Sequence, residues 1–265
     1  MTSHFLLCNY RILGINDIIK RKMLPLEEME LQKQFDDLLE DKFNIKFNDE
    51  SLLDEAMTQA SYVNEHPGQG LKFYERLEFL GDAVYQLVVS DYIFRRFPEL
   101  PQGRLTRLRA AMVNEHSFSR FARECHFDKY IRLGKGEEKA NARQRDSLLC
   151  DIFESFIGAV YLDQGMATVK HFCEIVIFPK LDEGWFDEFF DHKTELQEVV
   201  QEDGPVDLDY ELVSEDGPDN DRKFKVAVKI NGKEMGVGLG HSKKDAEQKA
   251  AKKALNELGV STSIK

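Results

Sequence analysis

The sequence has few cysteines, and their spacing excludes two common roles. Only four occur in 265 residues, at Cys8, Cys125, Cys150 and Cys173, and no two form a Cys-x-x-Cys pair. This usage predicts free thiols in a reducing compartment, the cytoplasm, with no disulfide partner and no cysteine zinc site. No run of about 18 apolar residues occurs either, so we expect no membrane-spanning segment.

The histidines lack the spacing to glutamate that is typical of a site with two metal ions. None of the seven has a glutamate three residues before it. Helical bundles that bind two iron or two manganese ions combine buried carboxylates with Glu-x-x-His pairs. The sequence therefore disfavours that class of enzyme.

Positive charge is scarce over most of the chain, whose formal net charge is −12. One stretch differs: residues 222–253 carry ten Lys and Arg against three Asp and Glu, or +7. A local basic face matters more for nucleic-acid binding than the net charge does. The C-terminal part is therefore the candidate nucleic-acid-binding region.

The most informative segment is 75–82, which reads Glu-Arg-Leu-Glu-Phe-Leu-Gly-Asp. Its carboxylates, Glu75, Glu78 and Asp82, are three and four residues apart, so a helix would place them on one face. The neighbouring positions are mostly apolar. An acidic stripe on an apolar helix needs cations, or it must take up protons.

A second acidic pair, Asp151 and Glu154, lies three residues apart in another apolar segment. If the two helices pack together, at least four carboxylates converge, and each close pair repels by about 4 kcal/mol at an effective dielectric near 20. A divalent cation would relieve this repulsion, and ligands that are all oxygen favour Mg²⁺, Mn²⁺ or Ca²⁺ over Zn²⁺. The alternative is a set of ordinary surface acids with salt-bridge partners.

The pattern of hydrophobic residues predicts a multi-domain chain. Residues 1–28 are an N-terminal extension, 29–183 have nearly unbroken helical periodicity, and 184–192 form a linker. The last part, 193–262, has the order α-β-β-β-α, with strands near 208–214, 223–230 and 233–240. The expected fold is an all-α domain followed by a small α+β domain. Within the first we expect helices at 52–57, 75–97, 103–113, 115–125, 147–162 and 168–181.

These motifs resemble those of bacterial ribonuclease III. The segment 75–84 is similar to the signature of that family, and 133–138 with 143–154 is similar to its second motif. The segment 97–110 lies between them in the family's order. The α-β-β-β-α order is that of a double-stranded-RNA-binding domain, so the resemblance extends from about Phe35 to the C-terminus.

The resemblance implies an endoribonuclease that hydrolyses double-stranded RNA with Mg²⁺, or Mn²⁺ as a substitute, to 5′-phosphate and 3′-hydroxyl ends. Its expected substrates are ribosomal RNA precursors and some messenger and transfer RNAs. Carried over by position, the metal ligands are Glu78, Asp82, Asp151 and Glu154. Of these, Asp82 and Glu154 are the expected catalytic residues, and Glu75 matches a position that contacts RNA.

The remaining expected roles concern RNA and a second subunit. The resemblance implies RNA contacts from two helices and a loop, at Thr194, Gln197, Glu198, Asn220, Lys243 and Lys244. It also implies a homodimer in which Phe79 inserts into the partner. Three places depart from the family: Gln102 stands where Glu is common, Asn220 where His is common, and Asn141-Ala142 where two glycines are common.

These departures leave one alternative open, a non-catalytic double-stranded-RNA-binding regulator with the same fold. The four retained carboxylates oppose it. Cleavage assayed with and without Mg²⁺ discriminates the two.

Overall fold

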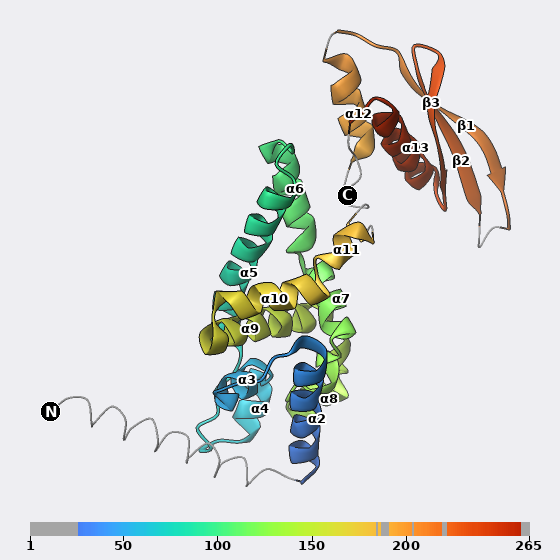
Figure 1. Cartoon of the computed structure of the whole chain (residues 1–265). Coiled ribbons are helices and arrows are strands. Elements are labelled where there is room, and N and C mark those ends of the chain that lie inside the picture. Colours follow the sequence, from blue (N-terminus) through green and yellow to red (C-terminus); the bar gives the residue numbers. More distant parts are fainter. Residues whose placement is uncertain (1–25, 184, 187–190, 203, 219–221, 261–265) are drawn as a thin grey trace. The chain divides into compact units, whose positions relative to one another are not determined.

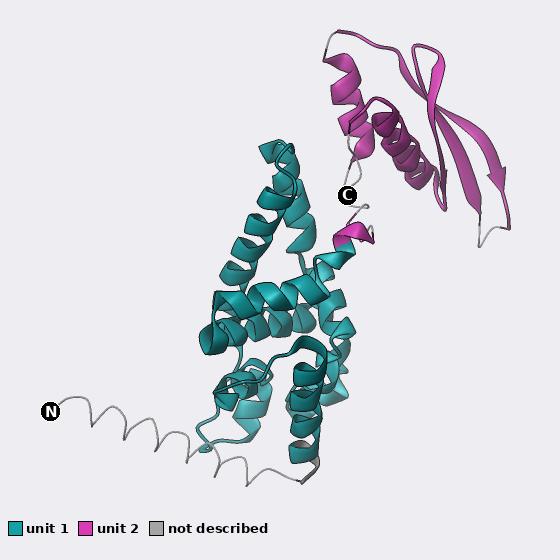
Figure 2. Ribbon diagram, viewed as in Figure 1, with its two compact units in different colours: residues 1–180 teal, residues 181–265 magenta. Residues whose placement is uncertain are grey.

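The computed structural model describes residues 26–183, 185–186, 191–202, 204–218 and 222–260. The chain divides into two compact units, with the boundary in the sequence between Lys180 and Leu181, and each unit is described by itself (Figure 2). Residues 1–25 of the expected N-terminal extension lie outside the described residues. Its last three residues, 26–28, already belong to the first described helix.

The first unit is helical, as predicted (Figure 1). Its α-helices are α2 (Leu26–Phe43), α3 (Glu50–Ala56), α4 (Ala60–Glu65), α5 (Glu75–Arg96), α6 (Gln102–Met112), α7 (Glu115–Glu124), α8 (Lys135–Lys139), α9 (Asp146–Gln164) and α10 (Met166–Val176). Two short 3₁₀ helices, η1 (Phe127–Lys129) and η2 (Ala142–Gln144), connect α7, α8 and α9.

One predicted helix is wrong in its extent. The expected helix at 168–181 is two helices, because α10 ends at Val176 and α11 spans Pro179–Asp182. Proline lacks a backbone N–H and its ring clashes with the preceding turn, so it begins helices rather than continuing them. The break therefore follows from Pro179.

Helix α9 forms the centre of the first unit. Ten of its residues are buried, on nearly all sides, and the rings of Phe153 and Phe156 pack among aromatic side chains from other elements. Its neighbours include α3, α5, α7 and α10. Polar side chains on this helix are thus held by a rigid, apolar framework.

The second unit is a three-stranded antiparallel sheet with two helices, which confirms the predicted α+β fold. Its elements are α12 (His192–Gln201), β1 (Leu208–Asp216), β2 (Lys223–Ile230), β3 (Lys233–Gly240) and α13 (Lys243–Glu257). The strand order is β1-β2-β3, with Tyr210 opposite Val228 and Val228 opposite Gly236.

Alternate glycines on β3 let α13 lie directly on the sheet. A Cβ atom at Gly236, Gly238 or Gly240 would come within 2.0–2.5 Å of α13 backbone atoms of Ala246 or Ala250. The helix presents small alanines to the strand, and all of them are fully buried. This packing fixes the start of α13 beside the end of β3.

Candidate metal centre and RNA-binding surface

Helices α5 and α9 cross with their backbones almost in contact, at two glycines. A Cβ atom at Gly81 would lie 1.8 Å from the carbonyl oxygen of Glu154, and one at Gly158 would lie 2.3 Å from that of Leu77. Only glycine permits such an approach. Because Asp82 follows Gly81 on α5, the crossing brings it beside Glu154.

We expect Gly81→Ala to destabilise the first unit and to disturb this crossing. The added methyl group overlaps the α9 backbone, which cannot move aside as a flexible side chain would, so the cost should be about 3 kcal/mol. Urea denaturation of the variant measures it. The matched control is Gly136→Ala on α8, where an added Cβ meets no heavy atom within 4 Å. Equal stability of the two variants would contradict the close crossing.

The structure brings the predicted carboxylates of the two helices together. Glu78 and Asp82 lie on α5, Asp151 and Glu154 lie on α9, and all four are half-buried. Ligand atoms of Asp151, Glu154 and the neighbouring thiol of Cys150 lie within 4.8 Å of one another. Glu75 is exposed, at the first residue of α5.

The pKa values of these carboxylates reflect their burial and the repulsion among them. Burial, followed by repulsion from Asp82, Glu78 and Asp151, raises the pKa of Glu154 to about 8. Burial likewise raises the pKa of Glu78, and charge on Asp151, Glu75 and Asp82 adds to the effect. The pKa of Asp151 is also raised, mainly by burial.

No Lys or Arg among the described residues forms an ion pair with these four carboxylates. The four half-buried carboxylates offer only oxygen ligands and have no internal counter-charge, and such a donor set fits a hard divalent cation.

Sequence reasoning missed several neighbours of the cluster. The hydroxyl of Tyr74 donates to Oδ2 of Asp151 at 2.9 Å, and Nε2 of Gln86 donates to Oδ1 of Asp82 at 2.8 Å. Glu115, the first residue of α7, raises the pKa of Asp151 by its charge. The four-residue spacing of Gln86 from Asp82 could have revealed one of these contacts, but the other two are tertiary.

The predicted RNA contacts of the second unit lie at helix starts. Lys243 and Lys244 are exposed at the first two positions of α13, after Ser242, whose Oγ accepts a hydrogen bond from the backbone N–H of Asp245 at 3.1 Å. Thr194 donates its backbone N–H and hydroxyl to the carboxylate of Asp191 at the start of α12.

The other residues predicted to contact RNA are exposed or lie outside the described residues. Gln197 and Glu198 are exposed on α12, and Asn220 lies outside the described residues. Gln102 is exposed at the start of α6, where its Nε2 donates to Oγ1 of Thr106 at 3.3 Å. The structure therefore does not bring Gln102 into a hydrogen bond with the carboxylate cluster.

The residue predicted at a dimer interface is exposed. Phe79 exposes 82% of its surface on α5, and Leu87 and Phe94 expose 59% and 69% on the same helix. Large apolar side chains are seldom left this exposed in a group.

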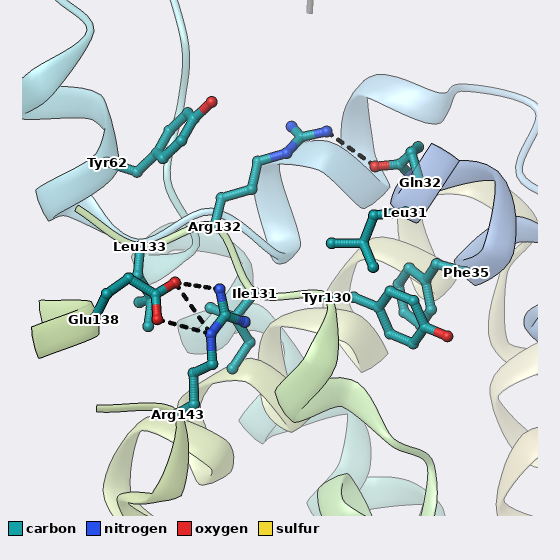
Figure 3. Close-up of a pocket in the computed structure, with 10 residues that line it drawn as sticks. All are labelled: Leu31, Gln32, Phe35, Tyr62, Tyr130, Ile131, Arg132, Leu133, Glu138 and Arg143. Carbon is teal, nitrogen blue, oxygen red and sulfur yellow. Dashed lines mark hydrogen bonds and ion pairs between the residues drawn. The ribbon is translucent and has the colours of Figure 1, made fainter. Parts of the chain in front are cut away.

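A pocket of about 150 Å³ lies elsewhere in the first unit, between α2 and residues 130–133 (Figure 3). Arg132 binds Gln32 and Asp54, and Arg143 binds Glu138 and the carbonyl oxygen of Asp128. Figure 3 shows the carboxylate of Glu138 and the guanidinium group of Arg143 facing each other. Both guanidinium groups are thus engaged in contacts within the fold, and none of the four carboxylates lines this pocket.

Comparison with known proteins agrees with this geometry. A family model described as "Ribonuclease-III-like" matches residues 49–181, and the "Double-stranded RNA binding motif" model matches 192–258. Ribonuclease 3 of Pediococcus pentosaceus is 68% identical over 226 residues, which cover 85% of this chain and 97% of that protein. The chain belongs to the ribonuclease III family.

One further relative matches over nearly its full length, and a solved structure matches the nuclease domain alone. Ribonuclease 3 of Limosilactobacillus reuteri is 63% identical over 226 residues, again 85% of this chain and 97% of the relative. A solved nuclease domain of ribonuclease III from Campylobacter jejuni is 35% identical, with a TM-score of 0.49, and covers 54% of this chain and 94% of that domain. Membership makes the chain a nuclease with a double-stranded-RNA-binding domain, and its family uses divalent metal ions.

The structure also bears on membranes and disulfides. Among the helices of the described residues, none has the length and apolar content needed to cross a membrane. Cys125, Cys150 and Cys173 are free thiols, and Cys8 lies outside the described residues.

Proposed function

We propose that the chain hydrolyses double-stranded RNA with Mg²⁺, or Mn²⁺ in its place, and leaves 5′-phosphate and 3′-hydroxyl ends. The observation that carries this proposal is the crossing of α5 and α9, which concentrates four carboxylates without a cationic partner among the described residues. Precursors of ribosomal RNA and some messenger and transfer RNAs are the proposed substrates.

The residues have distinct proposed roles. Glu78, Asp82, Asp151 and Glu154 would hold the metal ions, which when bound would activate a water molecule and stabilise charge on the leaving oxygen. Asp82, which adjoins Gly81, and Glu154, whose carbonyl oxygen faces Gly81, are the proposed catalytic residues. The exposed carboxylate of Glu75 lies at the rim, where it would position the RNA.

Recognition of the duplex is assigned mainly to the second unit. Proteins bind double-stranded RNA by its shape, across two minor grooves and the phosphates between them. Thr194, Gln197 and Glu198 on α12, together with Asn220, would contact 2′-hydroxyls. Lys243 and Lys244 would contact phosphates, because the helix start adds free N–H groups and a favourable dipole. Gln102 would add a neutral contact from α6.

We expect the double variant Lys243→Ala/Lys244→Ala to bind duplex RNA more weakly and with less dependence on salt. Each phosphate contact that is lost should lower the slope of log K against log salt by about one. Fluorescence anisotropy at several salt concentrations measures it. The control is Lys233→Ala, at the far end of β3 from the start of α13. An unchanged slope in the double variant would show that neither lysine contacts the RNA.

The exposed apolar residues of α5 support a homodimer. Two copies that meet at Phe79, Leu87 and Phe94 would bury these side chains symmetrically, as a two-fold interface requires. Sedimentation equilibrium tests this. A chain that stays monomeric at all concentrations would contradict it.

Cleavage and RNA binding are assigned to different parts of the chain. We assign cleavage to residues 29–183 and RNA binding to 193–262, with 184–192 as the linker and 1–28 as an extension. The family matches at 49–181 and 192–258 support this division. Limited proteolysis checks it, because the first cuts should fall in the linker or the extension. The free thiols support a cytoplasmic location, which cell fractionation would check.

A cleavage assay on a long RNA duplex tests the proposed function. Short duplex products with Mg²⁺ and none with EDTA are the expected result. Binding without cleavage in Mg²⁺ or Mn²⁺ would favour the alternative, a regulator that binds double-stranded RNA and does not cut it.

A further inference from the structure

Two of the four clustered carboxylates accept a hydrogen bond from a neutral side chain. Tyr74 donates its hydroxyl to Asp151 on α9, and Gln86 donates its amide to Asp82 on α5. In the described part of the chain, no side chain donates to Glu78 or Glu154. The cluster therefore has two carboxylates held in place and two that are not.

We propose that Tyr74 is a positioning residue that orients Asp151 as a metal ligand, and that Gln86 does the same for Asp82. This inference rests on the proposed role of these carboxylates in holding metal. In each contact the donor occupies one oxygen, Oδ2 of Asp151 or Oδ1 of Asp82, and leaves the other for a cation. Such partners of metal ligands fix the ligand's orientation.

The neutrality of both donors matters for this role. A lysine or arginine at either place would cancel the charge of the carboxylate and compete with the cation. A phenol or an amide orients the carboxylate and leaves its charge available. The hydroxyl of a tyrosine carries no charge at neutral pH, so Tyr74 can donate to Asp151 without neutralising it.

The surroundings of Tyr74 make it a rigid support. It exposes only 8% of its surface. Its backbone N–H donates to the carbonyl oxygen of Thr58 at 3.1 Å, and its own carbonyl oxygen accepts from the N–H groups of Leu77 and Glu78 at 2.8 and 2.9 Å. Tyr74 is therefore the N-cap residue, immediately before α5, and its side chain reaches across to α9. One residue thus links the helix that carries Glu78 to the helix that carries Asp151.

Gln86 is held less firmly, by its place one turn beyond Asp82. Its carbonyl oxygen accepts from Oγ of Ser90 at 2.7 Å, and Nη1 of Arg109 donates to the same Oγ at 3.3 Å. The backbone of Gln86 is therefore linked through Ser90 to Arg109 on α6. We expect Gln86 to contribute less than Tyr74, because Gln86 is only half-buried.

The test compares Tyr74→Phe with Tyr85→Phe in the full chain. The first variant loses only the hydroxyl that contacts Asp151. The second loses a fully buried hydroxyl that donates instead to the carbonyl oxygen of Met112 at 3.3 Å. Mn²⁺ binding without RNA, followed by electron paramagnetic resonance of the free ion, gives a readout independent of cleavage. The Mg²⁺ concentration for half-maximal cleavage and the KM for duplex RNA at saturating Mg²⁺ complete the set.

We expect Tyr74→Phe to weaken Mn²⁺ binding and to raise the Mg²⁺ requirement by roughly tenfold each, with the KM for RNA unchanged. Gln86→Leu should shift both in the same direction by less, and Tyr85→Phe should shift neither. Unchanged Mn²⁺ binding in Tyr74→Phe, or an equal loss in Tyr85→Phe, would overturn the inference.

Asp151→Asn separates failure of this inference from failure of the proposed function. If it loses Mn²⁺ binding while Tyr74→Phe retains it, Asp151 is a ligand that needs no support from Tyr74. If Asp151→Asn binds Mn²⁺ and cleaves normally, the metal assignment itself is wrong, and the inference that rests on it is overturned too.

Discussion

Glu154→Gln is expected to lower the rate of duplex cleavage at least ~10³-fold while duplex binding is retained. Loss of a single preorganised electrostatic contact commonly costs 10²–10³ in rate, and loss of a metal ligand should cost no less. Glutamine keeps the size of the side chain but removes its charge. Single-turnover cleavage of a labelled duplex and a gel-shift assay of the same samples measure the two effects.

The matched control is Glu174→Gln, an exposed glutamate on α10 that takes no part in the cluster. It should cleave at the wild-type rate. A Glu154→Gln variant that also cleaved at the wild-type rate would contradict the metal assignment. Equal loss of binding and cleavage would show that Glu154 acts on RNA binding instead.

The metal-free protein is expected to lose stability as the pH rises from about 4.5 to about 8. Glu154 has a pKa of about 8 in the folded chain and an ordinary value of 4.5, so the folded state retains a proton that the unfolded state has released. The raised carboxyl pKa stabilises the folded state fully below pH 4.5. This contribution is lost as the pH rises from 4.5 to about 8. The raised pKa values of Glu78 and Asp151 act in the same direction.

Divalent metal should reverse this trend, because it binds the ionised cluster in the folded state only. At a concentration one hundred times its Kd, a ligand of this kind stabilises by about 2.7 kcal/mol. Thermal unfolding in EDTA and in Mg²⁺, from pH 5 to pH 9, measures both effects. Glu154→Gln should flatten the curve in EDTA. A wild-type melting temperature that changes with neither pH nor Mg²⁺ would contradict the account.

Local spacing made much of the fold and half of the site predictable. The three- and four-residue spacing of Glu75, Glu78 and Asp82 fixes their common face on α5, and the α-β-β-β-α order of the second unit follows from its alternating residues. Serine is a favoured residue at helix starts, and Ser242 takes that place before α13, where its side chain accepts a hydrogen bond from the backbone N–H of Asp245.

Tertiary contacts were not predictable in the same way. Tyr74 and Asp151 are 77 residues apart, and no local pattern relates a phenol before one helix to a carboxylate on another. The close approach at Gly81 and Gly158 also depends on how α5 and α9 pack together. A glycine within an apolar helix does not by itself predict which other backbone will approach it. The break at Pro179, in contrast, has a cause in the sequence itself, because proline cannot continue a helix.

The central claim is that carboxylates on α5 and α9 form the divalent-metal centre that cleaves RNA. A crystal soaked in Mn²⁺ and measured at the manganese absorption edge tests it most directly. The account predicts an anomalous peak between the two helices, within ligand distance of Asp82 and Glu154, and no such peak in the Glu154→Gln variant. A cleaving enzyme whose manganese peaks all lay away from these carboxylates would contradict it.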